Sequence, residues 1–112
     1  MEIASEVRPG ILILAPEGEI TLGNAGEVNE FVTRKMGDAY RKLVFDLKNV
    51  TYLDSSAVGM IVAIHTGLQG PDGGAVRLCN LSSDVLEVFK ASSLESFLNI
   101  DLTLEESLGA LA

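Results

Sequence analysis

Three polar residues between two apolar segments are the part of this chain best suited to chemistry. Asp54, Ser55 and Ser56 follow an apolar stretch that ends at Leu53 and precede the apolar run 57–64. At the start of a helix, a carboxylate or a hydroxyl can cap free N–H groups, and a serine there can also carry a phosphate, because the positive end of the helix dipole stabilises an anion. Capping by Asp54 or Ser55 and modification of Ser55 therefore both remain open on the chemistry of these residues alone.

A hydrolytic role for Ser55 is excluded by spacing. A nucleophilic serine needs a base within hydrogen-bond reach, and the only histidine, His65, lies ten residues further along the same expected helix. A rise of 1.5 Å per residue separates the two by roughly 15 Å along the axis. We therefore interpret His65 as a helix residue near the end of a buried segment.

The other chemically capable residues do not form a catalytic or metal-binding pattern. Asp46 ends a strand, as a receiver phosphoacceptor would, but the sequence lacks the acidic pair and the lysine that such a site requires. Glu17 and Glu19 are interpreted as solvated turn charges, and Cys79 as a small core residue. Residues 23–26 match no nucleotide-binding loop. We expect a protein that is not an enzyme and has no metal and no cofactor.

Composition limits the partners. The 112 residues, of which 47% are hydrophobic, are sufficient for a single domain, which we place at 1–112. The net charge of −8 divides into −2 for residues 1–49 and −6 for residues 50–112, which argues against binding to nucleic acid or an anionic membrane. One cysteine, no signal-peptide pattern and no apolar run of spanning length predict a cytoplasmic protein without direct membrane insertion. The oligomeric state does not follow from composition.

The expected elements alternate between strands and helices. Strands are predicted at 3–7, 11–15, 42–47, 75–79 and 98–100, with a hairpin turn at 8–10 and Gly18 ending the second strand. Helices are predicted at 24–36, at 57–64 with the polar residues 54–56 at its start, at 82–91 and at 104–111. The order predicts an α/β fold with a mixed central sheet of about four to five strands and about four helices.

Several helix ends are also predicted. Asn24 is a candidate N-cap and Gly37 the stop of the first helix, and Ser82 or Ser83 caps the third. The run 57–64 is apolar on all sides and should form the most buried helix, ended by Gly67 and the turn 70–74.

The segment 43–59, LVFDLKNVTYLDSSAVG, resembles the signature of the STAS domain, and in particular that of bacterial anti-sigma factor antagonists. The resemblance extends over nearly the whole chain and implies a STAS fold. It also implies that Ser55 is the phosphoacceptor, flanked by Asp54 and Ser56. Ala57 and Thr21 stand where the family often has glycine and aspartate. The implied partner-binding residues are Glu19, Ile20, Thr21, Asn24, Ala57, Val58, Met60 and Ser82.

The same resemblance implies partner switching. The unphosphorylated protein would bind an anti-sigma factor that is itself a serine kinase and so release a sigma factor. Phosphorylation of Ser55 would block binding, and a PP2C-type phosphatase would restore it. The charge argument agrees, since a phosphate adds about −1.5 to −2 charges beside Asp54. The alternative is a STAS scaffold subunit of a lipid transporter or of a stress-sensing complex, without a phosphoryl switch.

Overall fold

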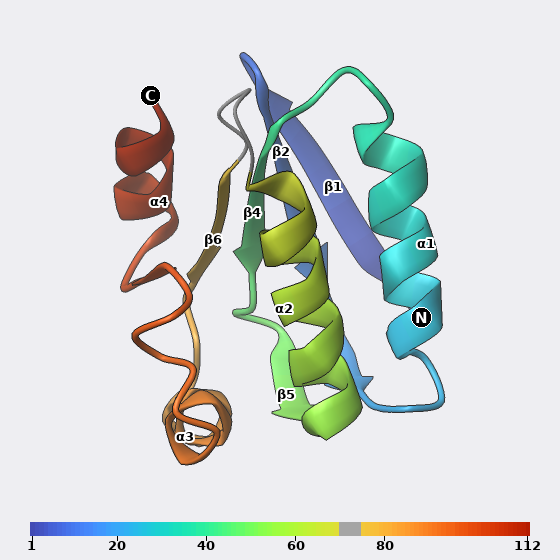
Figure 1. Ribbon diagram of the computed structural model, residues 1–112, viewed down its shortest axis with the longest axis vertical. Coiled ribbons are helices and arrows are strands. Elements are labelled where there is room, and N and C mark those ends of the chain that lie inside the picture. The colour runs from blue at the N-terminus through green and yellow to red at the C-terminus, as the bar shows by residue number, and fades with distance from the viewer. Residues whose placement is uncertain (70–74) are drawn as a thin grey trace.

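The sheet and the helices that cover it follow the predicted α/β order. The computed structural model describes residues 1–69 and 75–112 and, within them, a five-stranded sheet with the strand order β1-β2-β4-β6-β7, a two-stranded sheet β3-β5 and four helices (Figure 1). The strands are β1 (Ile3–Arg8), β2 (Ile11–Pro16), β3 (Gly18–Ile20), β4 (Lys42–Asp46), β5 (Val50–Leu53), β6 (Ala75–Cys79) and β7 (Ile100–Asp101). The helices are α1 (Ala25–Met36), α2 (Ser55–Leu68), α3 (Ser83–Ala91) and α4 (Leu104–Leu111). The predicted fold class is confirmed.

The sheet is mixed, as predicted. Strands β1 and β2 form an antiparallel hairpin whose turn includes Gly10 at a φ of 74°, a left-handed conformation that glycine adopts without strain. From β2 onward every pairing in this sheet is parallel. Because side chains alternate along a strand, Leu12 and Leu14 pack under α1 and α2, whereas Ile11 and Ile13 pack with α4 on the opposite face. Two hydrophobic clusters result, one on each side of the sheet.

Helix α2 buries one side only. Its buried residues are Ala57, Val58, Ile61 and His65, and α1 buries the same number. The apolar run predicted the most buried helix, but its outward positions carry small residues such as Gly59 and Ala63, which are exposed. Ala63 borders a hollow of about 300 Å³ between α1 and α2. The apolar composition therefore reflects small outward residues as well as core packing.

Three local predictions need correction. Gly18 does not end β2 but begins β3, a strand of three residues that is too short to show a periodic pattern. The last strand is Ile100–Asp101 rather than 98–100, because Leu98 is used for the core and precedes the strand. Gly67 lies inside α2, which ends at Leu68, and the predicted turn 70–74 lies outside the described residues.

Cys79 and Arg77 act structurally. Cys79 has no exposed surface, and burial raises the pKa of its thiol to about 11, so the reactive thiolate is scarce at neutral pH. Arg77 donates to both carboxylate oxygens of Asp101, at 2.7 and 3.0 Å, and the Ser107 hydroxyl donates to the same carboxylate. The bidentate Arg77–Asp101 pair joins β6 to β7. The Ser107 bond joins the same carboxylate to α4.

His65 is part of the core, as its position near the end of a buried segment indicated. It is 1% exposed, and its ring meets the Phe97 ring edge-on with 5.3 Å between centroids. Its Nε2 lies 3.0 Å from the Gln69 amide nitrogen. Burial lowers the pKa of His65, because the imidazolium would lose hydration in this environment.

A pH dependence of stability follows from His65. Because its pKa is lower in the folded than in the unfolded chain, the stabilisation is complete above the unfolded value of about 6.5 and is lost as pH falls toward the folded pKa. We expect urea denaturation to give a free energy of unfolding that declines from pH 6.5 to pH 5. In His65→Gln this decline should flatten. An equal decline in the variant would assign the pH dependence to other groups.

Candidate functional site

Asp54 holds together the start of α2 and a loop distant in sequence. Its Oδ1 accepts a hydrogen bond from the Ala57 N–H at 3.0 Å and caps the helix. Its Oδ2 accepts one from the Leu22 N–H, also at 3.0 Å. These backbone donors, the Ala57 N–H foremost, hold the pKa of Asp54 below its usual range. The carboxylate is therefore a fixed negative charge at the helix terminus.

Ser55 is the first residue of α2 and is exposed. Asp54 occupies the capping position, so the cap does not require the Ser55 hydroxyl. Within residues 1–69 and 75–112, no hydrogen bond joins this hydroxyl to another residue. The two roles that the sequence left open are thus divided between neighbours, with Asp54 as the cap and Ser55 available at the surface.

The loop between β3 and α1 is closed by its own hydrogen bonds. The Asn24 side chain accepts a bond from the Thr21 N–H at 2.8 Å and donates one to the Glu19 carbonyl at 2.9 Å. Asn24 does stand at the N-cap position of α1, but its side chain does not cap that helix, because both of its polar groups serve the loop. The Asn24 and Ala25 N–H groups both donate to the Thr21 carbonyl. The result is a compact turn whose shape is determined from within.

Pairing of β3 with β5 brings this loop to Ser55. The two strands are parallel, with Ile20 opposite Leu53, so their carboxyl ends meet at the same edge. The Asp54 N–H continues the pairing by donating to the Ile20 carbonyl at 3.2 Å. Residues 21–24 and 54–56 thereby become one surface, although about thirty residues separate them along the chain.

The residues predicted to bind a partner differ in accessibility. Glu19, Ser55 and Ser82 are exposed, and Thr21, Asn24, Asp54, Ser56 and Met60 are partly buried. Three others, Ile20, Ala57 and Val58, have side chains that are at most 3% exposed and belong to the core. These three support the surface from below. Ser82 caps α3, accepting a bond from the Val85 N–H at 3.2 Å.

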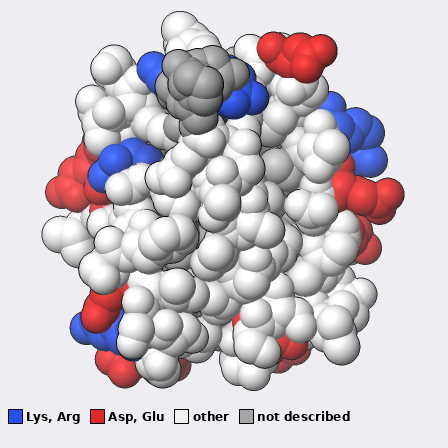
Figure 2. All heavy atoms as spheres, viewed as in Figure 1, with Lys and Arg blue, Asp and Glu red and all other residues white. Residues whose placement is uncertain are grey.

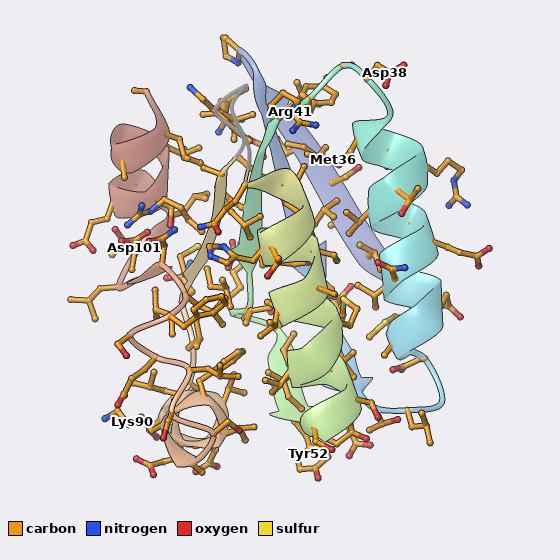
Figure 3. All side chains as sticks on the ribbon, in the orientation of Figure 1. Met36, Asp38, Arg41, Tyr52, Lys90 and Asp101 are labelled. Atoms are coloured by element: carbon orange, nitrogen blue, oxygen red, sulfur yellow. The ribbon has the colours of Figure 1, made fainter. Side chains whose placement is uncertain are left out.

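Leu22 and Tyr52 are two residues of this surface that the sequence reasoning missed. The Leu22 side chain is 79% exposed beside Asp54, and Tyr52 is 49% exposed. Figure 3 places Tyr52 beside the first turn of α2, at the end of the molecule opposite Met36 and Arg41. One feature of the sequence could have indicated Leu22. It is an apolar residue in the otherwise polar turn 21–24, and it does not belong to the apolar pattern of a neighbouring strand or helix.

Charge is concentrated away from the centre of the face formed by α1, α2 and α3. Figure 2 shows this face largely uncharged in its middle, with acidic and basic side chains toward its rim. The described residues contain no group of three or more His, Cys, Asp or Glu side chains that could hold a metal ion. In the same part of the chain, no helix is both long and apolar enough to cross a membrane.

A family model described as "STAS domain" matches residues 2–107. The chain belongs to the STAS domain family. A STAS-domain containing protein of Pseudomonas aeruginosa is 32% identical over 89 residues, covering 73% of this chain and 87% of that protein. BtrV of Bordetella bronchiseptica, named as a candidate anti-sigma factor antagonist, is 24% identical over 110 residues, covering 98% of this chain and 94% of BtrV.

Solved STAS structures share the fold. A candidate anti-sigma factor antagonist from Thermotoga maritima superposes with a TM-score of 0.88 at 24% identity, covering 96% of this chain and 92% of that one. SpoIIAA, an anti-sigma factor antagonist, superposes in its unphosphorylated form with a TM-score of 0.81 at 20% identity, covering 98% and 96% of the two chains. The phosphorylated form of SpoIIAA from Bacillus superposes with a TM-score of 0.73 at 19% identity, covering 99% of this chain and 100% of that one.

Proposed function

We propose that this STAS protein is a cytoplasmic, non-enzymatic anti-sigma factor antagonist controlled by phosphorylation of Ser55. The observation that carries the proposal is the division of roles at the start of α2, where Asp54 caps the helix and leaves the Ser55 hydroxyl exposed, with no hydrogen-bond partner among the residues that the structure describes. A modifiable serine must reach an enzyme without unfolding its own domain, and this placement meets that requirement.

The proposed chemistry is phosphoryl transfer by a partner. The Ser55 Oγ attacks the γ-phosphorus of ATP bound to a serine kinase that is also the anti-sigma factor. The new O–P bond forms as the bond to the β-phosphate oxygen breaks, ADP leaves, and a base on the kinase takes the hydroxyl proton. A PP2C-type phosphatase hydrolyses the phosphoserine and returns the protein to its binding form.

The start of α2 accommodates the phosphate within the domain. Ser55 lies at the N-terminal end of a helix of fourteen residues, where unpaired N–H groups and the helix dipole favour an anion. In a docked complex the same group would be desolvated next to the Asp54 carboxylate, which is costly without paired cations from the partner. The phosphate therefore blocks docking and leaves the fold intact, a local electrostatic switch.

Phosphorylation is expected at Ser55 and not at its neighbour. The purified protein would be incubated with ATP and each serine-kinase anti-sigma factor encoded in the same genome, and the modified residue mapped by mass spectrometry. Ser55→Ala should abolish phosphate incorporation, because the acceptor oxygen is gone. Ser56→Ala is the matched control and should retain it, since Ser56 is only partly exposed.

A kinase that binds the protein but leaves Ser55 unmodified would contradict the proposal. Modification of Ser56 with Ser55 unmodified would contradict the assignment of the acceptor. Stable recovery of the protein with a lipid-transporter permease, unaffected by Ser55→Asp, would instead favour the scaffold role without a phosphoryl switch.

A further inference from the structure

Leu22 is exposed in a setting that holds it firmly in place. Its side chain is 79% exposed, whereas its N–H donates to the Asp54 Oδ2 at 3.0 Å. The turn that carries it is closed by the two Asn24 side-chain bonds described above. The backbone of such a pre-ordered turn loses little conformational freedom when the side chain that it carries binds a partner.

Leu22 also lies beside the phosphoacceptor. One Asp54 carboxylate bonds both the Leu22 N–H and the Ala57 N–H, so the loop residue is linked directly to the first turn of α2 that begins with Ser55. Tyr52, opposite Glu19 in the β3-β5 pairing, adds a half-exposed aromatic ring at this end of the molecule. The surface around Ser55 is thus apolar as well as acidic.

We propose that Leu22 is an apolar anchor through which this protein selects its anti-sigma factor. The inference rests on the proposed function and adds a specificity-determining residue to it. The leucine side chain enters an apolar pocket of the anti-sigma factor, next to the part of that partner that contacts Ser55.

The chain provides a closely matched control leucine. Leu102 is 81% exposed, and its N–H also donates to a carboxylate, that of Glu106, at 3.0 Å. It lies between β7 and α4, in a different loop from Leu22. Leu22→Ala and Leu102→Ala therefore remove the same apolar surface from equally exposed, similarly held positions and differ in their relation to Ser55.

The test is the affinity and dissociation rate of the full chain for the anti-sigma kinase that phosphorylates it, measured by calorimetry and surface plasmon resonance. We expect Leu22→Ala to bind about ten- to a hundredfold more weakly, mainly through faster dissociation, because the buried methyl groups are lost. Leu22→Met should retain most of the affinity. Leu102→Ala should bind like the unmodified protein, and all three variants should keep its melting temperature.

Two failures are distinguishable. If Leu22→Ala binds as tightly as the unmodified protein to a kinase whose binding still requires unphosphorylated Ser55, the anchor role is overturned and the switch stands. Equal losses in Leu22→Ala and Leu102→Ala would also overturn it. If no serine-kinase anti-sigma factor binds the unmodified protein, the proposed function fails and the anchor role with it.

Discussion

Replacing Ser55 with aspartate is expected to weaken binding to the proposed anti-sigma partner about a hundredfold, or about 2.7 kcal/mol, while leaving the melting temperature within about 3 °C. The new carboxylate lies next to that of Asp54, and a docked partner would have to desolvate both. Like charges brought together at an interface cost several kcal/mol. In the free domain the same carboxylate lies at the N-terminal end of α2, where it is tolerated.

Two control variants test whether the loss of affinity requires a negative charge at position 55 in particular. Ala110→Asp adds the same charge to an exposed position of α4, whose apolar side packs on the opposite face of the sheet. This variant should retain its affinity. Ser55→Ala should also bind, and its binding should no longer respond to ATP. Binding of Ser55→Asp at full affinity would contradict the electrostatic switch, and a large fall in melting temperature would show that Ser55 is mainly a structural residue.

Truncating Phe45 is expected to have the largest effect on stability, a loss of about 3–5 kcal/mol on substitution by alanine. Phe45 is 1% exposed on β4, which has β2 on one side and β6 on the other. Neighbouring side chains on a paired strand cannot move far to fill the space left behind, so a cavity cost adds to the lost burial. Since domains are commonly stable by only 5–15 kcal/mol, this variant should be close to unfolding at body temperature.

Phe97→Ala is the matched control for that measurement. It makes the same substitution at a side chain that is 49% exposed, and we expect a loss of about 1–2 kcal/mol. Both values would come from urea denaturation followed by circular dichroism. Similar losses in the two variants would contradict the central position of β4, whereas the expected difference supports the packing of α1 and α2 on this strand.

Local pattern was sufficient for most elements of this STAS fold. The bounds of β6 and α4 agree with the predicted 75–79 and 104–111. An apolar run or a helical repeat within one segment is sufficient to predict that segment's secondary structure and its buried side. The sequence also restricted the cap of α3 to Ser82 or Ser83, of which the structure uses Ser82, since capping is an interaction within four residues. The motif 54–56 also predicted the start of α2 and the candidate serine, Ser55.

Only the tertiary structure decided what surrounds Ser55. The β3-β5 pairing and the bond from the Leu22 N–H to Asp54, between residues 32 positions apart, depend on segments that meet after folding. Periodicity within a segment carries no information about such contacts, so the sequence predicts a turn where β3 forms and does not indicate a role for Leu22. The sequence by itself determined the fold class, the family signature and the candidate serine. The structure decided that Asp54, and not Ser55, caps α2, and the long-range bond from the Leu22 N–H to Asp54 placed the turn 21–24 beside the start of that helix.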